Sequence, residues 1–271
     1  MDERLHHILC SCRRGDIRGG AARALPRVDR PGRPGDRVTA IEDRVPAEPS
    51  PSAFTGRLWA AAATTYAAIL RHPFVSGLAD GGLDHRSFRF YVVQDGHYLH
   101  GFARALALLA ARAPTPGVTE MFARHTAALI TVERSLHGSL LTELARTDGD
   151  MADAGAAPTT LAYTSYLIAT CATGSFPDGI AAVLPCYWIY REIGRELQSR
   201  SSPDPLFTRW IDTYAGEDFD SAVQELLDLT DSIGATLSQE GRESAIDHFA
   251  TAARYEWMFW DAAYHRIDWL L

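Results

Sequence analysis

Helical periodicity extends through almost the whole chain from residue 51 onward, and no other feature of the sequence limits the possible folds so strongly. After Asp84, for example, apolar side chains recur every three or four residues, which is the spacing of one face of a helix. Proline and glycine interrupt the pattern at His72-Pro73, Pro114, Gly174 and Gly216, where helices are expected to end. No segment alternates apolar and polar residues over a convincing strand length. The sequence therefore predicts an all-α fold, a single-domain bundle of seven to eight helices.

The interruptions define the predicted helices. They are expected to cover residues 52–70, 84–113, 117–146, 159–173, 177–199, 205–214, 218–237 and 239–267. Asp84 is predicted to cap the second helix, because its short side chain can accept a hydrogen bond from a free N–H group of the first turn. Residues 74–82 are predicted to form an irregular connector closed by Gly81-Gly82, and residues 147–158 a loop.

The first 50 residues differ from the rest of the chain. They are rich in Arg, Gly, Pro and Asp and contain few large apolar side chains. Such a segment buries too little apolar surface to offset the entropy lost on ordering. We therefore expect a disordered N-terminal extension over residues 1–50 and one helical domain over residues 51–271. Cys10 and Cys12 lie in the extension near two histidines, but their spacing fits no standard zinc pattern.

The composition argues against several classes of function. All 26 basic residues are Arg, so the chain has no lysine for a Schiff base, for anchoring pyridoxal phosphate or for a Walker-type phosphate loop. The net charge is −8 and no basic stripe is present, so no nucleic-acid partner is expected. The longest apolar run, residues 105–111, is too short to cross a bilayer, and the four cysteines form no disulfide framework. We expect a soluble protein of the reducing cytoplasm, with no membrane association.

A proline lies well inside the helix predicted for residues 177–199, and a cysteine follows it directly. Pro185 has no N–H to donate to the carbonyl of Ala181, and a proline inside a regular helix costs about 3 kcal/mol. The Pro185-Cys186 pair therefore indicates one of two things. It marks either a shaped site or a kinked core helix with a buried thiol, since free cysteine is among the most buried residue types.

Two acidic residues occupy apolar helical faces. Asp95 shares a stripe with aromatic residues, and Glu256 lies in Tyr255-Glu256-Trp257-Met258-Phe259-Trp260. A carboxyl group in such surroundings must be paired or must have a raised pKa, so each is either a hydrogen-bonded core acid or part of a site. Two carboxyl groups beside a thiol would suit nucleophilic attack assisted by proton transfer. The tyrosines of neighbouring segments indicate either a pocket for a flat heterocycle or ordinary core packing.

Several stretches of the chain together resemble the thiaminase II (TenA) family. They are His72-Pro73-Phe74-Val75, Tyr91-Val92-Val93-Gln94-Asp95 with Tyr98-Leu99, Tyr163-Thr164-Ser165, Leu184-Pro185-Cys186-Tyr187-Trp188-Ile189-Tyr190, Trp210-Ile211-Asp212-Thr213-Tyr214 and Tyr255-Glu256-Trp257-Met258-Phe259-Trp260. Their order and spacing extend the resemblance over about residues 54–269. The resemblance implies the haem-oxygenase-like fold, and Pro185-Cys186 is similar to the cysteine-containing class of the family.

The resemblance also implies an activity, that of an aminopyrimidine aminohydrolase or thiaminase II of thiamin salvage. Such an enzyme hydrolyses 4-amino-5-aminomethyl-2-methylpyrimidine, and in many members thiamin, to 4-amino-5-hydroxymethyl-2-methylpyrimidine. Cys186 would be the nucleophile, and Asp95 and Glu256 the pyrimidine-binding and acid/base carboxyl groups. The tyrosines expected to line the ring pocket are Tyr98, Tyr163, Tyr190 and Tyr214. No metal or cofactor is expected, the partner is the small-molecule substrate, and the resemblance implies a homotetramer.

The sequence leaves two other functions open. Helical bundles of this kind also hold di-iron or haem sites in oxygenases. The candidate ligands for such a site are His97, Glu133, His137, Glu256, Asp261 and His265. Glu133 and His137 are four residues apart and share a helical face, but they do not form the paired Glu-x-x-His motifs of ferritin-like sites. The second alternative is a non-catalytic regulatory protein, which would not depend on Cys186.

Overall fold

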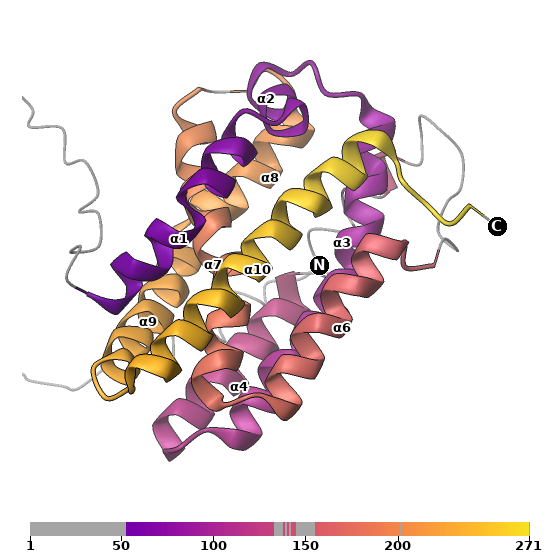
Figure 1. Cartoon of the computed structure of the whole chain (residues 1–271). Helices are drawn as coiled ribbons and strands as arrows, with labels where there is room; N and C mark the ends of the chain where they lie inside the picture. Colours follow the sequence, from indigo (N-terminus) through magenta and orange to yellow (C-terminus); the bar gives the residue numbers. More distant parts are fainter. Residues whose placement is uncertain are drawn as a thin grey trace, which may run out of the picture. The chain divides into compact units, whose positions relative to one another are not determined.

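Most helices in the computed structural model of this protein begin or end where a proline, a glycine or a short polar side chain interrupts the periodic pattern. The structure describes residues 53–132, 138, 140, 142–144, 155–200 and 202–270. Its helices are α1 (Phe54–Leu70), α2 (Pro73–Asp80), α3 (His85–Arg112), α4 (Pro116–Val132), α6 (Pro158–Thr173), α7 (Phe176–Gln198), α8 (Pro205–Ala215), α9 (Glu217–Gly234) and α10 (Gln239–His265) (Figure 1). None of the described residues lies in a strand, so the all-α prediction is confirmed for this part of the chain. Within the same ranges, no helix is both long and apolar enough to cross a membrane.

The capping groups explain why several helix starts were predictable. Asp84 accepts a hydrogen bond from the Arg86 N–H at 3.1 Å and caps α3, as predicted. Ser175 and Asp178 form a capping box at the start of α7, in which each side chain accepts a hydrogen bond from the other residue's backbone N–H. Asp204 caps α8 by accepting a hydrogen bond from the Leu206 N–H at 2.8 Å. Each of these interactions satisfies backbone groups that the helix itself cannot pair.

Residues 73–80 form helix α2, so the prediction of an irregular connector over residues 74–82 is wrong. His72 accepts a hydrogen bond at Nδ1 from the Phe74 N–H at 3.1 Å and thereby caps the helix. Pro73 occupies the first turn, where its missing N–H would have had no partner in the helix. Gly81 ends the helix in the left-handed conformation, with φ of 76°. The prediction used Pro73 as the end of one helix, although proline is equally suited to begin the next.

Three predictions fall on parts of the chain that the structure does not describe. The helix predicted over residues 117–146 begins as expected with α4, but most of its remainder after Val132 lies outside the described residues. The same holds for most of the loop predicted over residues 147–158 and for the extension predicted over residues 1–50. The division of the chain at residue 50 therefore stays a prediction. All described residues belong to one compact unit, Pro46–Leu271.

The packing of α3, α7 and α10 decides which residues share a site. These three helices all contact one another, and α10 also packs against α1, α2 and α6 (Figure 1). Helix α3 additionally contacts α4 and α6, while α7 contacts α8 and α9. Asp95 lies on α3, Cys186 on α7 and Glu256 on α10. Residues that are far apart in the sequence thus lie on helices that share one core.

A glycine allows α8 to lie close to α7. A Cβ atom on Gly194 would lie 2.8 Å from the backbone carbonyl carbon of Tyr214 and 2.9 Å from the backbone nitrogen of Ala215. These distances are shorter than non-bonded contacts allow, so a larger residue would push the end of α8 away. The close approach brings the ring of Tyr214 to 4.9 Å from the ring of Tyr190, measured between centroids.

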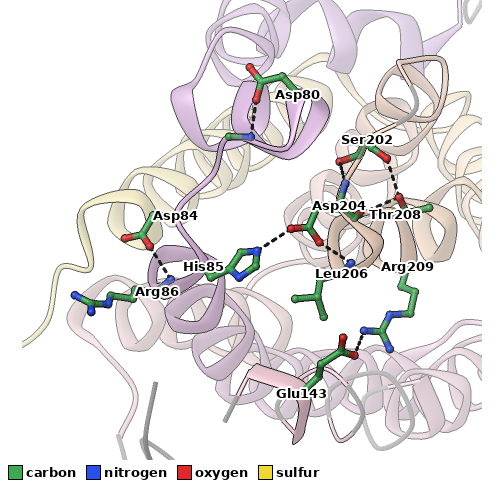
Figure 2. Close-up of polar contacts among 11 residues, drawn as sticks. Asp80, Asp84, His85, Arg86, Glu143, Ser202, Asp204, Leu206, Thr208 and Arg209 are labelled. Carbon is green, nitrogen blue, oxygen red and sulfur yellow. Dashed lines mark hydrogen bonds and ion pairs between the residues drawn. The ribbon is translucent and has the colours of Figure 1, made fainter. Parts of the chain in front are cut away.

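The beginning of α8 is tied to the beginning of α3 (Figure 2). Nε2 of His85 contacts Oδ2 of Asp204 at 2.7 Å, while the other carboxylate oxygen of Asp204 caps α8. Farther along α8, Arg209 forms an ion pair with Glu143 (Figure 2). These side-chain contacts fix the first two turns of α8, and Tyr214 lies near the C-terminal end of the same helix.

Candidate active site

Cys186 is partly exposed within a buried segment of α7. Residues 178–185 and 187–191 of α7 are all buried, whereas Cys186 between them keeps intermediate exposure. Pro185 precedes it inside the helix, as the sequence showed. Cys186 is therefore partly exposed within a segment that is otherwise buried. Of the two readings of Pro185-Cys186, this geometry favours a shaped site.

Glu256 is buried on α10, with 1% of its surface exposed. The hydroxyl of Tyr163 donates a hydrogen bond to its Oε1 atom at 2.6 Å. Burial raises the pKa of Glu256 to about 8; the Tyr163 hydrogen bond opposes this shift, and the charge of Asp95 adds to it. At neutral pH the carboxyl group is therefore mostly protonated and can act as an acid.

Asp95 lies on α3 with 2% of its surface exposed, and it belongs to the same site. Its negative charge raises the pKa of Glu256 and also that of Cys186. The charge of Glu256 in turn raises the pKa of Cys186. Such coupling requires that the groups lie close together in a medium of low polarity. The three predicted catalytic residues are thus brought together from three helices.

The Cys186 thiol favours its neutral form in the structure. Burial raises its pKa well above the usual range, and the charges of Glu256 and Asp95 raise it further, while Tyr98 lowers it. The Tyr98 hydroxyl lies close enough to influence the thiol, yet it makes no hydrogen bond of regular geometry to any described residue. A protonated carboxyl group, a thiol and a second carboxyl group in one place can combine acid/base steps with nucleophilic attack.

The four predicted pocket tyrosines are all present around these groups, in two pairs. Tyr98 and Tyr163 have ring centroids 5.0 Å apart on the side of Glu256. Tyr190 and Tyr214 have ring centroids 4.9 Å apart, and the charges of both Asp95 and Glu256 raise the pKa of each phenol. Aromatic rings and hydroxyl groups therefore lie near the carboxyl groups, and side chains of this kind are suited to hold a flat, polar ring.

Two aromatic residues beside this site, Tyr91 and Trp260, were not among the predicted site residues, although Tyr91 was one of the tyrosines considered for a pocket. Their rings stack at a centroid distance of 5.1 Å with an interplanar angle of 4°. The Tyr91 hydroxyl donates a hydrogen bond to the Tyr190 hydroxyl at 3.4 Å. The indole N–H of Trp260 is buried without a hydrogen-bond partner among the described residues. Both residues lie in stretches that carry the family resemblance, which was the available signal.

The candidate metal ligands do not converge in the described part of the chain. Asp261 contacts Nε2 of His72 at 3.3 Å and Nδ1 of His265 at 3.2 Å. Glu256 takes part in neither contact and instead accepts a hydrogen bond from Tyr163. Glu133 and His137 lie outside the described residues, as do Cys10 and Cys12 with their neighbouring histidines, and His97 is in no ligand cluster. Where side chains are described, no group of three His, Cys, Asp or Glu residues could hold a metal ion.

Fold and site together define the class. The all-helical arrangement is the haem-oxygenase-like fold, which is also the stated fold of a solved domain from Shewanella denitrificans. The two structures superpose with a TM-score of 0.62 at 16% identity, over 78% of this chain and 92% of that one. The chain belongs to the TENA/THI-4/PQQC family, whose model matches residues 59–266. The resemblance read from the sequence is thereby confirmed.

Individual relatives agree with this assignment. The chain is 32% identical over 216 residues to the aminopyrimidine aminohydrolase of Bacillus subtilis, covering 80% of this chain and 92% of that protein. The solved TenA homologue from P. horikoshii OT3 superposes with a TM-score of 0.71 at 28% identity, over 79% of this chain and 99% of that one. The thiamine biosynthesis multifunctional protein ThiED of Corynebacterium efficiens is 35% identical over 250 residues. That match covers 91% of this chain but only 33% of ThiED, so the chain spans about a third of that protein.

Proposed function

We propose that this protein is an aminopyrimidine aminohydrolase, a thiaminase II of thiamin salvage. It would hydrolyse 4-amino-5-aminomethyl-2-methylpyrimidine, and thiamin as a second substrate, to 4-amino-5-hydroxymethyl-2-methylpyrimidine. The proposal is supported by three groups on three packed helices, Cys186, Glu256 and Asp95, which lie within electrostatic reach of one another, and by the hydrogen bond between Glu256 and Tyr163. The near full-length similarity to an aminopyrimidine aminohydrolase supports it.

Glu256 and Asp95 bind and activate the pyrimidine in this proposal. A neutral aminopyrimidine is a poor electrophile, but protonation of a ring nitrogen opens the neighbouring ring carbon to a nucleophile. Glu256 donates that proton, because its pKa of about 8 keeps it protonated at neutral pH. Asp95 accepts hydrogen bonds from the exocyclic amine and from an adjacent ring N–H.

Cys186 supplies the nucleophile. The thiol proton passes to the amine of the substrate, the sulfur adds to the activated ring carbon, and electrons from the adduct then expel ammonia from the methylene carbon. Water adds to that carbon, the bond between sulfur and ring breaks, the proton released by the water restores the thiol, and the proton on the ring nitrogen returns to Glu256. The covalent path replaces one difficult displacement by two easier steps, and it uses no metal or cofactor.

The tyrosines hold the ring in place. Tyr98 has a buried hydroxyl without a regular hydrogen bond among the described residues, so a bound pyrimidine would satisfy it. Tyr163 is occupied with Glu256 and keeps the carboxyl group oriented. Tyr190 and Tyr214 offer ring faces on which the heterocycle can stack.

The decisive experiment incubates the purified protein separately with the aminomethylpyrimidine and with thiamin, followed by chromatography. We expect the hydroxymethylpyrimidine from at least the first substrate; its absence from both would refute the proposed function. Cys186→Ala should lower kcat about a thousandfold or more. Cys171→Ala is the matched control, because Cys171 is a buried thiol on α6 whose sulfur contacts the Gly179 carbonyl, and it should keep normal turnover.

The assembly and the location are proposed on the family resemblance and on the cysteine content. We expect a homotetramer that works in the cytoplasm. Light scattering coupled to size-exclusion chromatography measures the mass of the assembly directly, and a mass of one or two chains would contradict the tetramer. Fractionation of the source cells, followed by immunodetection, tests the location.

A further inference from the structure

A buried chain of polar side chains lies beside the candidate site but is not part of it. The Tyr187 hydroxyl lies 3.3 Å from Nδ1 of His125, and Nε2 of His125 lies 3.0 Å from Oε2 of Glu225. Tyr187 and His125 are 6% and 5% exposed, whereas the side chain of Glu225 is 44% exposed. The chain therefore runs from a buried phenol on α7 through α4 to a carboxylate at the surface of α9.

The protonation of His125 follows from its partners. Burial lowers the pKa of His125, although the hydrogen bond and the charge of Glu225 oppose this shift. The ring is therefore neutral near neutral pH and carries a single N–H. Nε2 faces a carboxylate, which can only accept, so that nitrogen holds the hydrogen. Nδ1 is left as the acceptor, and the Tyr187 hydroxyl donates to it.

Tyr187 is adjacent to Cys186, and the two are coupled. Burial raises the pKa of the Tyr187 phenol, and the charge of a Cys186 thiolate raises it further, so the phenol lies within electrostatic reach of the sulfur. Successive residues of a helix are separated by a fixed rotation of about 100° about its axis. Any rotation of the helix that moves the Cys186 side chain therefore moves Tyr187 as well.

The backbone of α7 is less constrained than usual at the turn before Cys186. Pro185 donates no hydrogen bond to the Ala181 carbonyl, so the turn before Cys186 lacks one of its backbone constraints. Tyr187 is held by its ring, which stacks against Phe219 at 6.3 Å and contacts Phe102 at 5.7 Å. Ring contacts tolerate small rotations, whereas a rotation that breaks the hydrogen bond to His125 leaves a buried hydroxyl unpaired, which is unfavourable.

We propose that Tyr187, His125 and Glu225 form a positioning chain, which holds the turn of α7 that carries Cys186 in its reactive orientation. The proposal rests on the proposed function for the identity of the reaction, but not for the placement of the thiol. Tyr187 and His125 are positioning residues, because neither makes a described contact with the reacting groups. Glu225 is kept in place by a second partner, Arg124, at 3.0 Å.

The first test compares Tyr187→Phe and His125→Gln with a matched control. Tyr166→Phe removes the hydroxyl of another tyrosine that bonds Nδ1 of a histidine, His248, at 2.7 Å between α6 and α10. We expect kcat to fall about tenfold or more in the two chain variants while KM stays within about twofold, because misplaced catalytic groups affect turnover first. Tyr166→Phe should leave both constants within about twofold of the wild type. Values of kcat within about twofold of this control in both chain variants would overturn the proposal.

A conservative variant separates positioning from simple packing. The amide of His125→Asn occupies the place of Nδ1 and can still accept the Tyr187 hydrogen bond, whereas the amide of His125→Gln occupies the place of Nε2 and cannot. His125→Asn should therefore recover most of the kcat that His125→Gln loses. Equal losses in both variants would contradict the assigned bond between Tyr187 and His125.

A substrate-free measurement keeps the test independent of the proposed function. The rate at which iodoacetamide alkylates Cys186 is measured at a fixed alkaline pH, with the modified peptide quantified by mass spectrometry. Burial is the main cause of the raised pKa of the thiol, so a turn that is no longer held opens more readily, exposes the sulfur and allows it to ionise. We expect faster alkylation in Tyr187→Phe and His125→Gln than in the wild type and in Tyr166→Phe, and unchanged rates would overturn the proposal. If the proposed function itself were wrong, the wild type would turn over neither substrate. The alkylation rates would still report on the positioning chain of Tyr187, His125 and Glu225.

Discussion

Replacing Glu256 by glutamine removes a buried titratable proton while keeping nearly the same shape. The wild-type carboxyl group is 1% exposed, accepts a hydrogen bond from Tyr163 at 2.6 Å and has a pKa of about 8. In the unfolded chain the same group has its ordinary pKa, 4.5. Folding therefore takes up a proton at this site over the intervening pH range, and the stability of the wild type must depend on pH there.

The sign and size of this dependence follow from the two pKa values. Because the folded pKa is raised, the contribution of Glu256 is fully present below pH 4.5 and is lost as the pH rises through 8. The difference of about 3.5 pKa units corresponds to about 5 kcal/mol, at about 1.4 kcal/mol per pH unit. Glutamine does not titrate, so Glu256→Gln should gain about this amount relative to the wild type between those limits.

The assay is urea denaturation followed by circular dichroism at a series of pH values from 4.5 to 8.5, chosen to span both pKa values. Glu240→Gln is the control, because Glu240 is an exposed glutamate in the first turn of the same helix, α10. We expect its stability to run parallel to that of the wild type, while the curve of Glu256→Gln diverges upward with pH. Parallel curves for Glu256→Gln and the wild type would show that Glu256 is not buried with a raised pKa, and the assignment of a neutral acid would be refuted.

Two further predictions concern the frame of the site and the start of the chain. Gly194→Ala should destabilise the protein by about 1–3 kcal/mol in denaturant melts and raise KM, because the added Cβ would meet the backbone of Tyr214 at 2.8 Å. Gly117→Ala is the control, because its Cβ would meet nothing within 4 Å, and it should change neither the stability nor KM. Deletion of residues 1–50 should leave the melting temperature and turnover nearly unchanged, because that segment is poor in large apolar side chains, and a large loss of either would contradict its assignment as an extension.

The positions of the helices were largely predictable because their signals are local. Asp84 caps α3 through a bond to a residue two positions away, and Gly174 follows the end of α6. The error at α2 has the same local origin. Pro73 both ends one helix and begins the next, and the capping role of His72 depends on a side-chain rotamer that sequence periodicity does not report.

Some of the residues of the candidate site were predictable from the sequence. Asp95, Cys186 and Glu256 were recognisable because each is polar in an apolar helical segment, and the family resemblance supplied their order. Their mutual influence was not predictable from pattern, and neither was the stacking of Tyr91 on Trp260. The Tyr187–His125 contact joins residues 62 positions apart, and the contact of His125 with Glu225 joins residues 100 apart.

The sequence by itself therefore determined the all-helical fold of the described residues, most of the places where those helices start and stop, and the residues able to carry chemistry. These properties depend on hydrogen bonds and apolar spacing within one or two helical turns. Only the tertiary structure decided that Glu256 is a neutral acid near neutral pH and that the turn carrying Cys186 is held by a chain from α4 and α9. Desolvation and long-range hydrogen bonds are sums over atoms from several helices, so they exist only once those helices have packed.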